Sequence, residues 1–109
     1  MATTYKVLGQ SAPLATTATT LYTVPAATEA VISSITVCNR TASPVTYRVA
    51  IRPDGDVLAD EHYLAYDVTV NGSDTTIMTV GLTINAADVV TVYASAADLS
   101  FGVYGSEIA

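Results

Sequence analysis

Hydrophobic and polar residues alternate with a period of two in short runs along most of this chain. Such alternation is typical of β-strands that bury one face, and no run has the spacing of an amphipathic helix. Residues that favour turns separate the runs. The sequence therefore predicts eight strands, at 3–10, 19–24, 30–39, 45–53, 62–70, 74–82, 88–95 and 99–108.

The run at 45–53 has the clearest alternation, and it predicts one core face and one outer face. The predicted core face carries Tyr47, Val49 and Ile51, and the other face carries Thr46, Arg48, Ala50 and Arg52.

The run at 30–39 is apolar in part on both faces, which is typical of a central strand covered on both sides. One face is expected to hold Val31, Ser33, Ile35 and Val37, and the other Ile32, Ser34, Thr36 and Cys38.

Turn residues set the expected connections. Pro53, Asp54 and Gly55 supply a turn, and Pro25 should close the second strand or mark a sheet edge. The Asn71-Gly72 pair favours a type I′ turn and predicts a hairpin between the strands on either side. Residues 96–98 are expected to form another hairpin loop. The run at 62–70 is either one strand or two strands broken near Asp67.

These elements predict an all-β fold, an eight-stranded antiparallel β-sandwich of jelly-roll type or a small barrel. The sandwich is favoured because several strands are apolar on both faces. A length of 109 residues indicates a single domain over 1–109. One hypothesis is that part of residues 1–20 forms an extended N-terminal arm. The Ala/Thr-rich segment from Ser11 to Thr20 is either an arm laid on a neighbouring subunit or a long loop.

The composition indicates that the surface carries few charged residues. Half of the residues are hydrophobic and only 13% are charged, which is about half the usual charged fraction. Neutral Thr, Ser and Ala must then form much of the exterior, and such a surface loses little hydration energy when another protein covers it. The alternative is an ordinary monomer with a Thr-rich exterior.

The net charge of −6 argues against nucleic acid as a partner, since only four residues are Lys or Arg. No apolar run is long enough to span a bilayer, and the first residues do not resemble a signal peptide. The expectation is synthesis in the cytoplasm, with no membrane partner. The single cysteine, Cys38, is interpreted as a buried free thiol.

Candidate catalytic and metal-binding residues are few. Asp60, Glu61 and His62 suggest an acid/base pair or a partial metal site, but no second histidine or thiol lies nearby in sequence. Asp54 and Asp56 add carboxylates that could bind calcium, yet the order of a calcium-binding loop is missing. The sequence predicts no catalytic residue, no cofactor and no metal, so we expect a protein that is not an enzyme.

Three residues are predicted to lie in a protein interface: Tyr5, Arg48 and Arg52. The two arginines share the outer face of one predicted strand, where guanidinium groups could bind carboxylates of a partner. The alternative is that they pair with carboxylates of this chain. Tyrosines fit contact surfaces and core edges equally well.

Several segments, in this order, resemble a group of small structural proteins of tailed bacteriophages. The segments are TTYKVLGQ, LYTVPA, VCNR, YRVAIRP, HYLAYD, VYAS and YGSEI. The resemblance spans nearly the whole chain, apart from the run at 15–20 and the acidic stretch at 53–61. It implies a virion component without enzymatic activity, and it supplies no functional residues to transfer.

Together, the pattern and the resemblance predict a capsid decoration, or cement, protein. It would bind the major capsid protein lattice on the outside of the virion and stabilise the head, with further copies of itself, possible trimers included, as additional partners. The acidic charge suits that location, because packaged DNA would repel it. The alternative is a tail or head-fibre module that binds host surface glycan or protein, although the chain has no tryptophan to stack on sugars. A small enzyme is the third reading.

Overall fold

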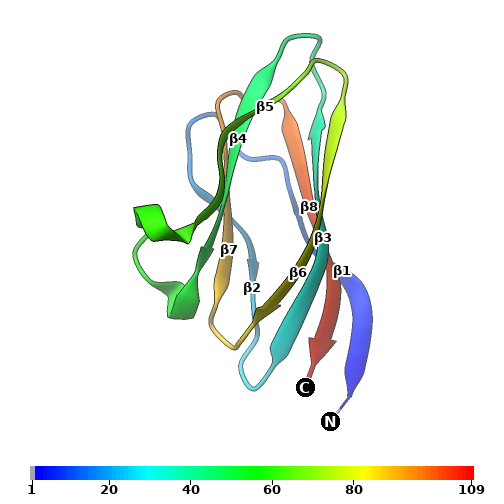
Figure 1. Cartoon of the computed structure of the whole chain (residues 1–109), viewed down its shortest axis with the longest axis vertical. Coiled ribbons are helices and arrows are strands. Elements are labelled where there is room, and N and C mark those ends of the chain that lie inside the picture. Colours follow the sequence, from blue (N-terminus) through cyan, green and yellow to red (C-terminus); the bar gives the residue numbers. More distant parts are fainter. Residues whose placement is uncertain (1) are drawn as a thin grey trace.

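The structure is a computed structural model, and it describes residues 2–109. Eight strands and two short 3-10 turns make up the regular structure (Figure 1). The strands are β1 (Thr3–Ser11), β2 (Thr19–Thr23), β3 (Glu29–Asn39), β4 (Val45–Arg52), β5 (Tyr63–Val70), β6 (Thr75–Ile84), β7 (Val89–Ala94) and β8 (Leu99–Ile108). The 3-10 turns are η1 (Pro53–Gly55) and η2 (Asp60–His62), both between β4 and β5.

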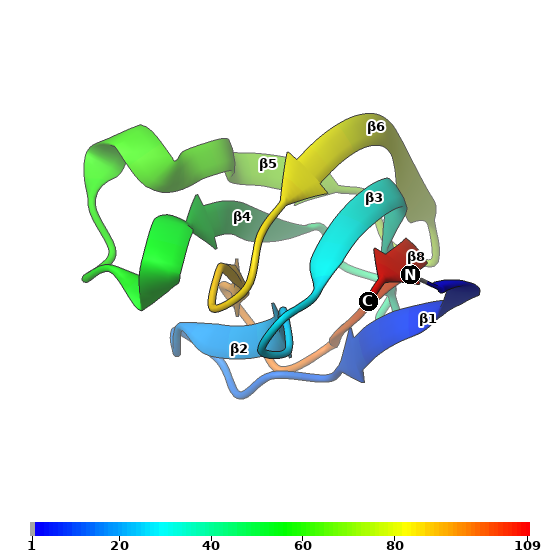
Figure 2. The same cartoon turned by 90° about the horizontal axis from the view of Figure 1, so that it is seen from below.

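The strands form two antiparallel four-stranded sheets that pack face to face (Figure 2). One sheet has the order β1-β8-β3-β6 and the other has the order β2-β7-β4-β5. The chain changes sheet at every connection except the one between β4 and β5. This order is that of a jelly roll, built from two Greek keys. The predicted antiparallel β-sandwich is therefore confirmed, and the sheets do not close into a barrel.

The core lies between the two sheets, because each strand turns its more apolar side inward. Tyr47 of β4 and Phe101 of β8 meet there edge to face, with ring centroids 6.2 Å apart. Val49 is fully buried, Tyr47 nearly so, and Ile51 packs against the core, which confirms the core face predicted for 45–53. Ala50, predicted on the outer face, is also buried. Burying such side chains contributes roughly 1.5–3 kcal/mol each. The sandwich is held together mainly by this layer.

The predicted faces of β3 are correct for only part of the strand. β3 is a central strand, as predicted, because it pairs with both β8 and β6. Its pairing shifts between Ile32 and Ser34, so Ile32 and Ile35 are both fully buried although they are three residues apart. An extra residue in a strand reverses the side on which the following residues lie. Ile32 therefore shares the core face with Ile35 and Val37, while Val31 lies on the other face, so the prediction is wrong for Val31 and Ile32.

The hairpin prediction at Asn71-Gly72 is wrong. β5 pairs with β4, whereas β6 pairs with β3 in the other sheet, so the turn connects the two layers. Gly72 has a negative φ, and the residue with positive φ is Ser73. Glycine is required at 72 because a side chain there would collide with the carbonyl of Ala42. The dipeptide marks a turn, but glycine is needed at 72 because the turn packs closely against the β3–β4 loop.

The predicted hairpin loop at 96–98 is wrong for the same reason. It connects β7 and β8, which belong to different sheets. The turn at 53–55 is confirmed, with Asp54 and Gly55 both at positive φ. Segment 62–70, for which two alternatives were open, forms one strand from Tyr63. Its pairing with β4 shifts beside Asp67, which has a φ of 51°.

The N-terminal residues pack on the body of this chain. Thr3–Ser11 pairs along its length with β8, and the backbone N–H of Thr16 donates to Ala94 at 2.8 Å. Ser11 ends β1, Thr19 begins β2, and the residues between them connect the two strands. An arm laid on a neighbouring subunit stays a prediction. Residue 1 of the predicted arm lies outside the described residues. Cys38 is a free cysteine, as interpreted, but it is only partly buried, on the outer side of β3, so the prediction of a buried residue is wrong.

Candidate protein-binding faces

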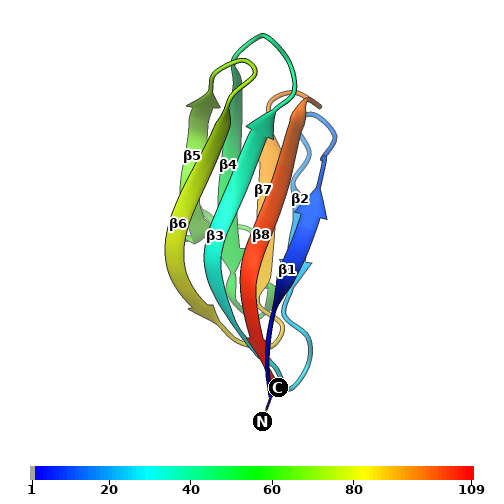
Figure 3. The same cartoon turned by 90° about the vertical axis from the view of Figure 1, so that its right-hand side faces the viewer.

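The sheet β1-β8-β3-β6 has an outer surface almost without charge. Its four strands contain only three charged residues, Lys6, Glu29 and Glu107. Lys6 and Glu107 bind each other on the inner side of the sheet, and Glu29 is the first residue of β3. We call this surface, which Figure 3 views directly, the uncharged face. Its outward residues include Tyr5, Val7, Val31, Thr36, Cys38, Ile77, Thr79, Gly81, Ser100, Gly102, Tyr104 and Ser106.

Large apolar side chains project from this face near its two margins. On β1, Tyr5 is 84% exposed and Val7 is 51% exposed, and on β6 Ile77 is 66% exposed. Between them the ring of Tyr104 lies over Gly102 and beside Thr36. A nearly neutral surface with exposed apolar groups fits contact with another protein.

The side chains of Lys6 and Glu107 point away from the uncharged face, and Glu107 also contacts Tyr22 of the other sheet. The ammonium of Lys6 lies 2.8 Å from a carboxylate oxygen of Glu107. The second oxygen accepts a hydrogen bond from the hydroxyl of Tyr22, on β2. Lys6, Tyr22 and the charge attraction together lower the pKa of Glu107. Burial, together with the carboxylate, raises the pKa of Tyr22. The strand pair β1 and β8 is thereby tied to the opposite sheet.

The outer face of the other sheet carries an arginine between two tyrosines. The Arg48 guanidinium carbon lies 4.1 Å from the centre of the Tyr66 ring and 4.2 Å from that of Tyr93. Its Nε is 2.7 Å from a carboxylate oxygen of Asp67. The hydrogen bond to Asp67 raises the pKa of Arg48. Tyr63 packs edge to face against Tyr66, at 4.9 Å between ring centres.

The shift in β5 pairing positions this cluster. Asp67 adopts a positive φ at the irregularity, a conformation that Asp tolerates better than most residues. Its carboxylate thereby reaches Arg48 on the neighbouring strand. Tyr66 and Tyr93 were missed as partners of Arg48. No sequence signal identifies them, because their proximity depends on which strands pair and in which register.

The arginines and Tyr5 lie on opposite faces of the sandwich. Arg48 pairs with a carboxylate of this chain, which is the second of the two alternatives considered. Arg52 donates to the hydroxyl of Thr91 and the carbonyl of Asp56, each at 3.0 Å. Both guanidinium groups therefore have partners within the chain. A single flat partner surface could not contact Tyr5 and the arginines together.

Of the predicted acid/base candidates, His62 has a structural role in the β4–β5 connection. His62 is buried, and its Nδ1 accepts a hydrogen bond from the backbone N–H of Ala59 at 3.0 Å. Asp54, Asp56, Asp60 and Glu61 are all exposed in the β4–β5 connection. Among residues 2–109, no three His, Cys, Asp or Glu side chains lie close enough to form a metal site.

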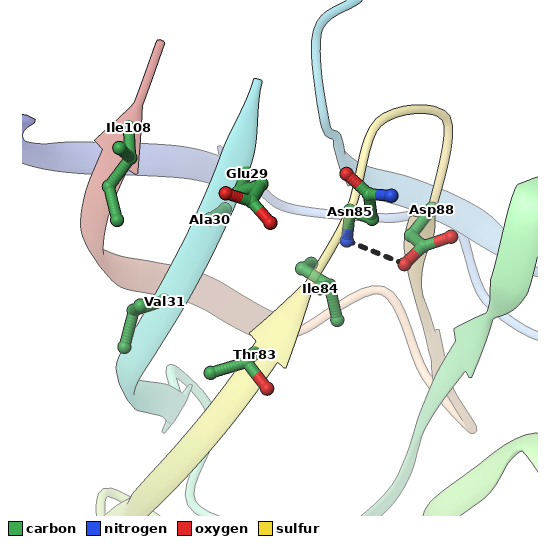
Figure 4. Close-up of a pocket in the computed structure, with 8 residues that line it drawn as sticks. All are labelled: Glu29, Ala30, Val31, Thr83, Ile84, Asn85, Asp88 and Ile108. Atoms are coloured by element: carbon green, nitrogen blue, oxygen red, sulfur yellow. Dashed lines mark hydrogen bonds between the residues drawn. The ribbon is translucent and has the colours of Figure 1, made fainter. Parts of the chain in front are cut away.

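A surface depression of about 420 Å³ lies where β3 begins and β6 ends (Figure 4). Glu29 and Asp88 are the carboxylates that line it. Asp88 accepts hydrogen bonds from the backbone N–H groups of Asp54 and Asn85, both at 2.8 Å. Its carboxylate thus anchors two turns.

No family model matches the chain, and no curated protein matches it either. In the part of the chain that the structure describes, no helix is long and apolar enough to cross a membrane. The two outer faces are therefore the features on which a functional proposal rests.

Proposed function

We propose that this chain is a non-enzymatic structural protein of a phage virion that binds the capsid lattice through the uncharged face. The observation that carries the proposal is the arrangement of charge. Lys6 points to the inner side of the sheet, Arg48 and Arg52 lie on the other sheet, and Arg40 follows the end of β3 and donates to the carbonyl of Ala97, while Tyr5 and Ile77 project from the uncharged face. Removing charged groups from water is costly, so a face without them can be covered over a wide area at low cost.

The fold also supports the proposal, but it is less specific than the charge arrangement. Jelly-roll sandwiches are common among proteins that assemble into viral shells, although the same architecture also occurs in lectins and cupins. The resemblance of the sequence segments to phage structural proteins narrows this range. As a decoration protein, the chain would stabilise the head by mass action, since it would bind only the assembled lattice.

Co-sedimentation with purified capsid shells tests the proposal. We expect the protein to pellet with intact shells and to remain in solution with dissociated capsid subunits. Tyr5→Ala should weaken shell binding by about tenfold or more, because exposed tyrosines often dominate interfaces. Leu14→Ala is the matched control, since Leu14 is 72% exposed in the β1–β2 loop and off the uncharged face. Equal losses for the two variants would contradict the assignment of the face.

The copy number per particle provides a second test. A protein that decorates the lattice is present in proportion to the lattice sites. A component confined to a single cyclic ring is present only in the copies of that ring, about a dozen or fewer. A copy number of that smaller size in quantified virions would reject the decoration role.

The cluster around Arg48 favours a second candidate function, binding of host surface glycan. Tyr66 is 56% exposed and stands beside a fixed guanidinium group, an arrangement that offers a ring face and hydrogen-bond donors to a sugar. Binding of the purified protein to host cells, abolished by Tyr66→Ala, would support this function. Binding unchanged by that substitution, or no binding at all, would remove it.

A further inference from the structure

The sandwich has four edge strands, and three of them carry features that discourage pairing with another chain. An unpaired strand edge is a template for another strand, and proteins protect edges with bulges, charges, proline or short length. β1 has the inward-directed Lys6 and an irregularity between Val7 and Gly9. β2 has only five residues and is soon followed by Pro25.

β5 is protected in a comparable way. Its pairing is displaced twice along β4, and the charged Asp67 stands at one displacement. Such an edge does not present a straight row of free backbone groups to a second strand.

The fourth edge strand, β6, is long and has neither charge nor proline. Its pairing with β3 has one irregularity, opposite Ile32 and Ser34, which leaves the alternation of exposure along β6 intact. It spans Thr75–Ile84, ten residues with the sequence TTIMTVGLTI, without charge or proline. Its exposure alternates without interruption from one end to the other. β3 occupies one side of β6, and no strand of the described chain occupies the other (Figure 3). This combination is the expected form of an edge that accepts another strand.

The sequence of β6 is complementary to itself in an antiparallel arrangement centred on Val80. In that register Met78 faces Leu82, and Thr76 faces Ile84, all on the core side. Ile77 faces Thr83 on the outer side. Direct opposition of apolar or Thr side chains stabilises a strand pair, and opposed like charges destabilise it. The pairing brings no charged residues of the two strands together, although each chain carries a net charge of −6.

Apolar side chains beside β6 would widen the contact. The hydroxyl of Tyr47 approaches the sulfur of Met78 at 3.8 Å, and Tyr47 pairs with Val68 on β5. Val68 is 39% exposed and Ile77 is 66% exposed. Ile77 projects from the outer side of β6, and Val68 lies on β5 beside Tyr47, which contacts Met78 of β6. A stable interface buries roughly 800 Å² on each partner, so strand pairing alone is too narrow and needs such flanking groups.

We propose that two copies of this chain pair through β6, antiparallel and about a two-fold axis at Val80. The two four-stranded sheets then form one continuous eight-stranded sheet, and the two uncharged faces become one surface. The interface is isologous, as in most homodimers. This inference rests on the edge of β6 alone and does not depend on the proposed function.

Sedimentation equilibrium of the purified chain tests the pairing. We expect the mass of a dimer at high concentration, with dissociation on dilution. Thr79→Lys places a charge on each copy near the axis and should weaken association by about tenfold or more. Thr3→Lys is the matched control on the opposite edge strand, and it should leave association unchanged. A monomer at every concentration, or a dimer equally stable in Thr79→Lys, would overturn the proposal.

A cysteine cross-link keeps the test valid if Thr79→Lys impairs folding. Cys38→Ala with Val80→Cys leaves one thiol per chain, at the position predicted to face itself. Opposed residues in antiparallel strands have Cβ atoms about 4.5–5.5 Å apart, close to disulfide range. We expect a disulfide-linked dimer from this variant and none from Cys38→Ala with Thr3→Cys. Failure of the Val80→Cys chain to cross-link would overturn the two-fold register.

Binding to capsid shells distinguishes pairing between two copies of this chain from pairing with a strand of the shell protein. If the chain is a monomer and Thr79→Lys nevertheless abolishes binding to capsid shells, the edge of β6 accepts a strand of the shell protein and self-pairing is wrong. If the chain dimerises and does not bind shells, the self-pairing stands and the proposed function fails.

Discussion

The side-chain amide of Asn39, the last residue of β3, donates a hydrogen bond to the carbonyl of Val70, the last residue of β5, at 3.1 Å. The two strands belong to different sheets. The same amide nitrogen also contacts the carbonyls of Ser43 and Asn71, and its oxygen accepts from the backbone N–H of Thr41. One buried side chain therefore joins the β3–β4 loop to the β5–β6 turn, at the end of the sandwich away from the termini (Figure 1).

Replacing Asn39 should destabilise the fold. Asn39 is 2% exposed, and Asn39→Ala leaves buried backbone groups without partners, at a cost of about 2–4 kcal/mol. Asn71→Ala is the control, because the side chain of Asn71 is exposed in the same turn, and it should change stability by less than about 0.5 kcal/mol. Denaturant unfolding of the two variants provides the comparison. Equal stabilities would show that the Asn39 amide is not what fixes the turn.

Gly72→Ala should be strongly destabilising for a steric reason. A Cβ at this position collides with the backbone of Ala42, so the turn or the loop must move, and we expect a loss of about 2 kcal/mol or more. Gly81 offers a matched control, since a Cβ there meets nothing within 4 Å. Gly81→Ala should be neutral or slightly stabilising, because it reduces the freedom of the unfolded chain. Thermal unfolding that ranks the two variants in the opposite order would contradict this packing.

Gly72 also shows what could not be predicted from the sequence, namely the sheet to which the strand after a turn belongs. Period-two alternation predicted the strands and their core residues, because alternation reflects burial of one face. The Asn71-Gly72 dipeptide correctly predicted a turn, but turn chemistry is local and does not specify the sheet to which the next strand belongs. The extra residue near Ser33 had no signal in the sequence, so the phase of β3 before it was misassigned.

The candidate surfaces were predictable to a smaller extent. Low charge in the sequence indicated a surface suited to protein contact, and the structure locates the neutral part on β1-β8-β3-β6. The placement of Arg48 on an outer face followed from alternation. Its contacts with Tyr66 and Tyr93 did not, because the order and register of β7, β4 and β5 are set by the whole fold.

The link between Lys6, Glu107 and Tyr22 should make part of the stability depend on pH. Glu107 has a pKa lowered from its ordinary 4.5, so the folded state favours the ionised carboxylate. The resulting stabilisation is present above the unfolded pKa and is lost as pH falls through the folded value.

Glu107→Gln should therefore lose less stability than the unmodified chain between about pH 5 and pH 3. The difference is expected to be roughly 1 kcal/mol. Glu29→Gln, which alters an exposed glutamate of the same sheet, should leave the acid profile unchanged. Denaturant unfolding across this range measures both variants. Parallel curves for Glu107→Gln and the unmodified chain would contradict the link.

The thiol of Cys38 is a natural probe of the uncharged face. It is the single cysteine of the chain and is partly exposed on that face. We expect maleimide to label it in the free protein and to label it much more slowly on protein bound to shells. Labelling after release from the shell should return to the free rate. The same rate in both states would show that this part of the face stays open to solvent.

The most direct measurement of the central claim is a cryo-electron microscopy map of the virion at side-chain detail. The account predicts density for this chain repeated over the outside of the capsid lattice, with Tyr5 and Ile77 against capsid protein and Arg48 directed away from it. A map in which the chain is missing from the shell, or in which the uncharged face is turned to solvent while the Arg48 face contacts the capsid, would contradict it.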